Sequence, residues 1–211
     1  MTSRREFLSY AGVGAMAATV APVANVNAQA APRSPSQSSP AGYNPVRTLN
    51  GWTLPYTMKN GVKEFHLVAE EIEHEFAPGS VAKCWGYNGS SPGPTIEAVE
   101  GDRIRILVTN RLKEHTTIHW HGLLLPSGMD GVGGLNQPQI KPGETFAYEY
   151  TLRQHGTHMY HPHADEMTQM AVGMMGSFII HPKSGDDVPV DRDYCFLLHN
   201  WALHPGTYRP D

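Results

Sequence analysis

The chain has 211 residues, which is enough for one domain of ordinary size plus additional segments. Its formal net charge is -4 and 17% of its residues are charged, so the composition gives no sign of nucleic-acid binding. The 21 glycines and 17 prolines make up about 18% of the chain against a usual background of roughly 12%, and this excess favours an all-β protein with many turns.

Residues 1–30 have the features of an export signal. Ser3-Arg4-Arg5-Glu6-Phe7-Leu8 matches a twin-arginine signal, and a weakly apolar run of small residues follows at 10–24, with small-residue cleavage candidates behind it. This run is shorter than the roughly 20 apolar residues that span a bilayer, so we expect no membrane span. Residues 31–50, which begin with a stretch rich in Pro, Ser, Gln and Ala, are predicted to form a disordered linker.

Short segments of alternating polarity, separated by turns, make up the rest of the chain. Residues 63–76 predict a strand with a slip of one residue near Glu70-Glu71, of the kind that a β-bulge produces. Further strands are predicted at 95–99, 103–110, 118–125, 145–152, 156–161, 176–181 and 194–201, with a dense turn at 88–94 and a short helical or irregular segment at 165–175. This pattern predicts an all-β Greek-key β-sandwich or barrel.

Two pairs of histidines stand out, His119-Trp120-His121-Gly122 and, forty residues later, His161-Pro162-His163. Residues i and i+2 of a strand point to the same face, roughly 7 Å apart. Each pair therefore directs two imidazoles to one side of a sheet, while Trp120 points to the other side. Neutral imidazoles suit Cu, Zn, Fe or Ni, whereas Mg and Ca prefer oxygen ligands.

The segments from 62 to 182 resemble the first cupredoxin domain of the multicopper oxidases, the family of laccases, ascorbate oxidase and bacterial copper-tolerance oxidases. The motifs follow in order and with similar spacing: Asn88-Gly89, Pro92-Gly93-Pro94-Thr95-Ile96, Gly101-Asp102, His119-Trp120-His121-Gly122, Asp130-Gly131, Lys141-Pro142-Gly143, Gly156-Thr157, Tyr160-His161-Pro162-His163 and Gly176-Ser177-Phe178-Ile179-Ile180. The resemblance implies an all-β fold of the cupredoxin type, with a first cupredoxin-like domain at 51–185.

The resemblance also implies a role for each candidate site residue. His119 is similar to the type-2 copper ligand of a trinuclear cluster, and His121, His161 and His163 are similar to ligands of the type-3 copper pair. Asp130 aligns with an acidic residue that assists proton delivery. These residue types fit the reaction, because reducing O2 to water requires several redox-active metals and a source of protons.

The chain departs from the family pattern in two respects. The family completes its cluster with four more histidines and takes up electrons at a type-1 copper held by a His-Cys-His segment. Neither Cys84 nor Cys195 lies in such a segment, so no type-1 site is expected; both are expected to be small buried residues, with a disulfide as the alternative. Residues 186–211 resemble the incomplete start of a second cupredoxin domain, which predicts a truncated chain.

Two functional hypotheses follow. The first is the N-terminal part of a multicopper oxidase, exported to the periplasm by the twin-arginine route, which couples one-electron oxidation of a phenol or a metal ion such as Cu(I) to the reduction of O2 to water. It would require further cupredoxin domains in cis or, as a weaker alternative, another subunit, and this chain alone should be inactive. The second is a non-catalytic periplasmic copper-binding module.

Several other residues have competing interpretations. His158 lies on the opposite strand face from His161, so we expect it not to bind metal. Asp165-Glu166 could hydrogen-bond a ligand imidazole or cap a helix. The methionines could bind Cu(I), although core packing is the favoured interpretation; they are Met159, Met167, Met170, Met174 and Met175. The other histidines are expected to be surface or hydrogen-bonded residues: His66, His74, His115, His155, His181, His199 and His204.

Overall fold

The computed structural model describes residues 43–202 except 50, 186, 187 and 189. The predicted signal at 1–30, most of the predicted linker and the end of the chain from 203 onward lie outside these residues. In the part that the structure describes, no helix has the length and apolar character needed to cross a bilayer.

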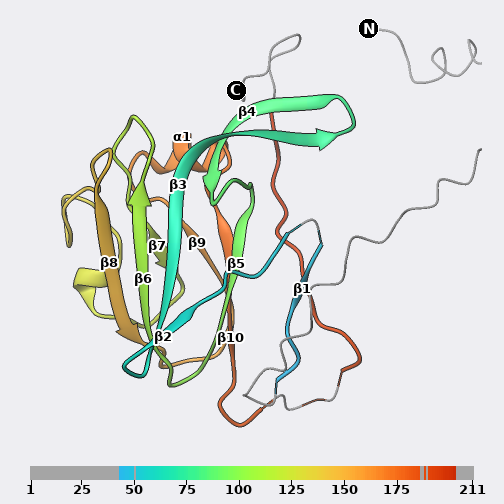
Figure 1. Cartoon of the computed structure of the whole chain (residues 1–211), viewed down its shortest axis with the longest axis vertical. Coiled ribbons are helices and arrows are strands. Elements are labelled where there is room, and N and C mark those ends of the chain that lie inside the picture. Colours follow the sequence, from blue (N-terminus) through green and yellow to red (C-terminus); the bar gives the residue numbers. More distant parts are fainter. Residues whose placement is uncertain (1–42, 50, 186–187, 189, 203–211) are drawn as a thin grey trace, which may run out of the picture. The chain divides into compact units, whose positions relative to one another are not determined.

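Strands dominate the described part of the chain (Figure 1). They are β1 (Arg47–Thr48), β2 (Thr57–Lys59), β3 (Val62–Ala77), β4 (Ser80–Tyr87), β5 (Gly93–Val99), β6 (Arg103–Asn110), β7 (His119–His121), β8 (Thr145–Thr151), β9 (Gly156–His161), β10 (Gly176–His181) and β11 (Tyr194–Cys195). One 3-10 turn, η2 (Ser127–Met129), and one short helix, α1 (Glu166–Ala171), accompany them. The all-β prediction is confirmed.

Two sheets make up the sandwich. One has the order β2-β3-β6-β8 with β4 paired to β3, and the other has the order β5-β10-β9-β7. Apolar residues alternate along the strands and fill the space between the sheets; the largest fully buried side chains are Trp120, Tyr87, Tyr148, Tyr160, Phe65 and Phe178. The core therefore fixes which faces of β7 and β9 point outward, and these faces carry the two histidine pairs.

The long strand β3 changes partners halfway along its length. Residues up to Ala69 pair with β6, whereas those from Ala69 onward pair with β4 and form a hairpin that projects from the sheet in Figure 1. Burial alternation changes phase near Glu70-Glu71, as predicted, because the partner strand changes there. The predicted bulge at that point is wrong: pairing with β4 is continuous across it, and the register shifts between Glu75 and Ala77 instead.

Other boundaries also differ from the sequence prediction. The strands expected at 118–125 and 194–201 are limited to β7 and β11, and strands β2 and β4 had not been predicted. Within the predicted linker, Arg47–Thr48 form β1, which pairs in parallel with Tyr194–Cys195. Local sequence does not indicate this pairing, because the two segments are far apart in the chain. The predicted short helical segment at 165–175 is confirmed by α1.

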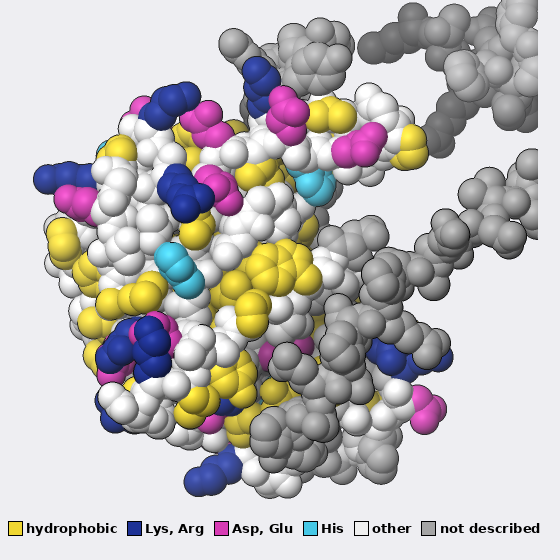
Figure 2. All heavy atoms as spheres, viewed as in Figure 1, with side chains coloured by type: hydrophobic (Ala, Val, Ile, Leu, Met, Phe, Trp, Pro, Cys, Tyr) yellow, Lys and Arg dark blue, Asp and Glu magenta, His cyan; other side chains and the backbone are white. Residues whose placement is uncertain are grey.

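The outward face of the larger sheet carries paired charges. Arg105 contacts Glu149 at 2.7 Å and Glu64 at 3.2 Å, and Arg103 contacts Glu149 at 2.9 Å. Figure 2 shows basic and acidic side chains lying next to one another on the visible face. The hydrogen bond from Lys59 lowers the pKa of the Glu64 carboxyl. Partial desolvation opposes this effect, and Arg105 adds to it. This face therefore has the mixed polarity of an ordinary solvated surface.

Candidate metal centre

Three of the four histidines lie on neighbouring antiparallel strands of the smaller sheet, His119 and His121 on β7 and His161 at the end of β9, and His163 follows β9. In the register of β7 and β9, His119 stands opposite His161 and His121 stands opposite Met159. Trp120 is fully buried in the core, so alternation places the flanking histidines on the outward face of the sheet. The predicted orientation of Trp120 is confirmed. Strand pairing thus joins two segments that are forty residues apart in the chain.

Three of the four predicted histidines converge closely. The candidate ligand nitrogens of His119, His121 and His161 all lie within 4.8 Å of one another. The Nδ1 atom of His121 faces the Nε2 atom of His161 at 3.1 Å. The ring of His163 lies 5.1 Å from that of His119, centroid to centroid, and adjoins this group without belonging to it. Among the described residues no other His, Cys, Asp or Glu group meets the same criterion.

Hydrogen bonds fix which nitrogen two of these rings present. The Nδ1 atom of His119 lies 2.7 Å from the backbone oxygen of Asp130, and that of His161 lies 2.9 Å from the backbone oxygen of Pro162. A carbonyl oxygen only accepts, so both Nδ1 atoms carry the proton and both Nε2 atoms keep a free electron pair. Burial lowers the pKa of His161, which also favours the neutral, metal-binding form.

Asp130 reaches His119 through both its backbone and its side chain. It follows the η2 turn, and its Oδ1 atom lies 3.3 Å from the Nδ1 atom of His119. Gly131 has a φ of +85°, and a Cβ atom built there would lie 1.8 Å from the backbone oxygen of Ile118. Only glycine permits this close approach, which brings the Asp130 carbonyl to the imidazole.

The loop that leads into β7 is held by side chains from other elements. Gln169 of α1 donates to the backbone oxygen of His115 and accepts from the hydroxyl of Thr116. The hydroxyl of Thr117 accepts from the backbone N–H of His163, and that of Tyr148 accepts from Ile118. The helix and the core thereby fix the entry to β7 and its position relative to the second histidine pair.

The roles of Asp165 and Glu166 separate in the structure. Asp165 is the N-terminal cap residue of α1, has a left-handed φ of 43° and makes no side-chain capping bond. The carboxylate of Glu166 lies 3.7 Å from His161 and 3.8 Å from His163. Of the two alternatives left open by the sequence, the position next to ligand imidazoles applies to Glu166. This contact was not predictable, because it depends on the direction in which α1 leaves β9.

The remaining histidines lie outside the cluster, with His204 outside the described residues. His66 bonds to Thr109 and His155 contacts Glu100, both at the surface. His158 is absent from the metal-capable group, as predicted, and burial lowers its pKa. His181 is the hydrogen-bonded alternative rather than the surface one: it is 4% exposed, and its Nε2 atom lies 3.1 Å from the buried carboxylate of Glu97.

The sulfur-containing residues divide into buried and accessible ones. Cys84 and Cys195 are both buried and unpaired, so the interpretation as small buried residues is confirmed over a disulfide. Met174 and Met175 lie in the interior, as packing predicts, whereas Met167 is 88% exposed. Met159 is half-buried beside His121. The methionines therefore do not form one site.

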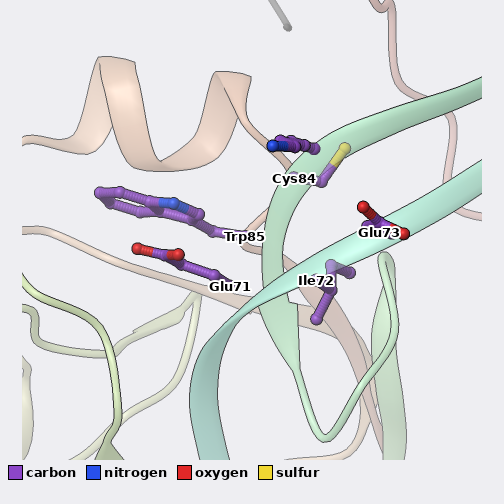
Figure 3. Close-up of a pocket in the computed structure, with 6 residues that line it drawn as sticks. Glu71, Ile72, Glu73, Cys84 and Trp85 are labelled. Carbon is purple, nitrogen blue, oxygen red and sulfur yellow. The ribbon is translucent and has the colours of Figure 1, made fainter. Parts of the chain in front are cut away.

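A separate hollow of about 420 Å³ lies on the β3–β4 hairpin (Figure 3). Figure 3 shows the side chains of Trp85 and Glu71, which are cross-strand partners, next to each other. Burial raises the pKa of the Cys84 thiol to about 11, so this thiol stays protonated at neutral pH. The clustered histidines do not line this hollow.

Three converging imidazoles, two of them with fixed tautomers, make a nitrogen-donor set that fits copper, zinc, iron or nickel. The fold and this cluster define a β-sandwich protein with a candidate transition-metal centre on the outward face of its smaller sheet.

Residues 69–185 match the family model described as multicopper oxidase. This match covers more than half of the sequence, and the chain belongs to the multicopper oxidase family. The resemblance stated from the motifs is confirmed, and copper is the metal that the family implies for the cluster.

Curated relatives include copper resistance protein A of Escherichia coli, which is 40% identical over 124 residues, covering 59% of this chain and 20% of the relative. L-ascorbate oxidase of Brassica rapa subsp. pekinensis is 38% identical over 155 residues, covering 70% of this chain and 26% of the relative. The chain therefore spans about a fifth to a quarter of the length of these relatives.

Solved structures show the same relationship. A multicopper oxidase from Pseudomonas thermotolerans superposes with a TM-score of 0.57 at 37% identity, covering 58% of this chain and 30% of that chain. A multicopper oxidase from Campylobacter jejuni, described as a metallo-oxidase, gives a TM-score of 0.57 at 33% identity. The match covers 69% of this chain and 31% of that chain. The cupredoxin-type sandwich prediction is confirmed.

Proposed function

We propose that this chain is the N-terminal, cluster-binding part of an exported multicopper oxidase that couples one-electron oxidation of a reducing substrate to the reduction of O2 to water. The observation that supports this proposal is the convergence of His119, His121 and His161 within 4.8 Å, inside the segment that matches the family. The domain limits proposed from the sequence, 51–185 for the first domain and 186–211 for the start of a second, belong to the same proposal.

The proposed copper ligands are His119 for the type-2 position and His121, His161 and His163 for the type-3 pair. Their donor atoms support this assignment, because the fixed Nδ1–H groups leave the Nε2 atoms of His119 and His161 unprotonated, and that of His161 faces the Nδ1 atom of His121 at 3.1 Å. His163 adjoins the three converging rings: its ring centroid lies 5.1 Å from that of His119 and 6.2 Å from that of His161.

Copper bound at these imidazoles would supply the electron transfer that O2 reduction requires. The protein's own groups would handle protons. We assign proton delivery to the carboxylate of Asp130, whose Oδ1 atom lies 3.3 Å from the Nδ1 atom of His119. Glu166, within 4 Å of His161 and His163, would orient these two rings.

The proposal requires groups that the described residues do not hold. Four further histidines and a type-1 copper site would come from additional cupredoxin domains in cis, or from another subunit as the weaker alternative. Export to the periplasm through the twin-arginine route is inferred from Ser3-Arg4-Arg5-Glu6-Phe7-Leu8 alone. The reducing substrate is proposed as a phenol or a metal ion such as Cu(I), since the named relatives differ in their substrates.

The first test is the intact mass of the protein from its native host, with copper determined on the same sample. We expect a mass well above 23.2 kDa and about four copper ions per protein. A mass at or below 23.2 kDa with one copper ion or none would instead support the non-catalytic copper-binding module and refute the oxidase proposal.

A variant pair tests the ligands in the same protein. Replacing both His121 and His163 by Ala should remove the copper pair and abolish oxidase activity, because both proposed type-3 positions lose imidazoles. The matched control replaces both His66 and His115, which are exposed, and should keep its full copper content. Unchanged copper in the first variant would exclude these residues as ligands.

A further inference from the structure

A second row of potential metal donors crosses the outward face of the smaller sheet, next to the histidine cluster. His121 of β7 stands opposite Met159 of β9, and Met159 stands opposite Ser177 of β10. Directly paired residues share a face, with Cβ atoms roughly 5 Å apart. The thiol of Cys195 continues the row, since its Sγ atom donates to the hydroxyl oxygen of Ser177 at 3.2 Å.

These side chains border a cavity of about 470 Å³. Strands β7, β9 and β10 form its floor, and the segment after β11 forms an apolar wall. The residues that line it are His121, Gly122, Thr157, His158, Met159, Ser177, Cys195, Phe196, Leu197 and Leu198. The cavity is large enough for a metal ion to pass, and it opens directly beside one edge of the histidine cluster.

The donors in this cavity differ from those of the histidine centre. Thiolate and thioether sulfur atoms are soft ligands that select Cu(I), whereas the three clustered imidazoles suit several divalent metals. Met159 and Cys195 lie on either side of Ser177 and both line the cavity, so two sulfur-bearing side chains border one space.

We propose that this cavity binds one Cu(I) ion through the Sδ atom of Met159 and the Sγ atom of Cys195, next to His121. On binding, the S–H bond of Cys195 breaks, a copper–sulfur bond forms and the proton leaves to solvent. Copper remains Cu(I) throughout, so no oxidant or reductant takes part. That the ion then supplies copper to the histidine cluster rests on the proposed function; the binding site itself does not.

The test is anaerobic titration of the 211-residue chain with Cu(I) in competition with a chromophoric Cu(I) chelator, with X-ray absorption to detect copper–sulfur scattering. The starting variant replaces His119 and His161 by Ala, which removes the histidine cluster. We expect this variant to retain one Cu(I) with copper–sulfur scattering. Adding Met159→Leu or Cys195→Ser should weaken the binding at least tenfold, and adding both should abolish the scattering.

Matched controls keep the comparison specific. Met159→Leu preserves side-chain volume, and Cys195→Ser keeps a hydrogen-bond donor next to Ser177, so both variants should fold, which circular dichroism checks. Cys84→Ser and Met167→Leu change the same residue types outside the cavity and should leave the affinity unchanged. Equal Cu(I) affinity in the Met159→Leu/Cys195→Ser variant and its parent would overturn the site.

The outcomes also separate this site from the proposed function. Copper–sulfur scattering that disappears on removal of His119 and His161 would refute the cavity site. It would not contradict the proposed histidine centre. Copper–sulfur scattering in the unsubstituted protein, with no copper bound at its histidines, would support the cavity site while refuting the oxidase proposal.

Discussion

The orientation of His119 depends on a glycine elsewhere in the chain. Gly131 adopts a left-handed φ and passes so close to Ile118 that any Cβ atom would clash with its backbone oxygen. This contact brings the carbonyl of Asp130 to the imidazole and fixes the tautomer. The sequence indicates Asp130-Gly131 as a motif, but the partner of this glycine is visible only in the fold.

We therefore expect Gly131→Ala to lower both stability and metal occupancy. The left-handed backbone alone costs a non-glycine residue about 1–3 kcal/mol, and relief of the clash would move Asp130 away from His119. Thermal unfolding and copper content measure the two effects. Gly134→Ala is the control: it has a similar φ of +81° with nothing within 4 Å, so it should lose stability but keep its copper.

Asp130 contacts His119 through two different oxygens, which allows its two roles to be separated. Asp130→Asn leaves the backbone carbonyl in place, so the tautomer of His119 and the copper content should be preserved. The amide cannot supply a proton as the carboxyl does, so turnover of the intact oxidase should fall by about 10²-fold or more. Steady-state oxygen consumption measures this, and unchanged turnover would remove Asp130 from proton delivery.

At the scale of elements, the outward face of the smaller sheet is covered by the segments before β2 and around β11. The buried carboxylate of Glu97 on β5 accepts hydrogen bonds from the hydroxyl of Thr53 and the backbone N–H of Val46, and it also faces His181 on β10. Val46, Ile179 and Cys195 form a small apolar cluster beside it. A buried polar group thus attaches the N-terminal segment to the sheet.

Glu97→Gln should release this segment. The amide replaces one accepting oxygen with an N–H donor, so one of the buried groups that contact this side chain loses its acceptor, which costs about 1–3 kcal/mol. In this variant, hydrogen exchange should become faster than in the parent at residues 46–49 and 51–54, whereas exchange at β6 should change less. The matched change Glu64→Gln, in the exposed ion-pair network, should leave exchange at both places unchanged. Equal protection in the Glu97 variant and the parent would contradict the attachment.

At the scale of the whole molecule, tyrosine hydroxyls in the core limit stability at high pH. Burial raises the pKa of Tyr148 to about 12, and it raises the pKa values of Tyr87, Tyr150 and Tyr160 well above their usual range. These groups keep their protons in the folded state but titrate near pH 10 once unfolded. The contribution of these protonated hydroxyls to the free energy of unfolding is therefore fully present below about pH 10, and it is lost as the pH rises toward 12.

We expect the free energy of unfolding to fall steeply between about pH 10 and 12, by about 2 kcal/mol from Tyr148 alone. Urea unfolding at several pH values measures the loss, and tyrosinate absorbance shows whether ionisation coincides with unfolding. In concentrated denaturant all tyrosines should titrate together near pH 10. Gradual tyrosine ionisation in a protein that stays folded would contradict the expected coupling.

The elements that alternate most regularly were predictable. Strands β6 and β8 lie almost where the alternation placed them, because each has one buried face and a period of two. Strand β10 also lies where it was predicted, but it is buried along its whole length and was indicated by an apolar run. Strand β7 is shorter than predicted, since only its three residues pair with β9. The short strands β1 and β11 form only by pairing with each other, so neither segment by itself indicates their limits.

The sequence by itself determined the all-β class, the multicopper oxidase family and the outward direction of the two histidine pairs, since these follow from alternation along one strand and from motifs contiguous in the chain. Only the tertiary structure decided that three imidazoles converge closely with His163 beside them, that Glu166 lies between two rings, and that Met159, Ser177 and Cys195 border one cavity. The reason is physical: strand register and loop packing set the distances between residues far apart in the chain, and no local pattern encodes them.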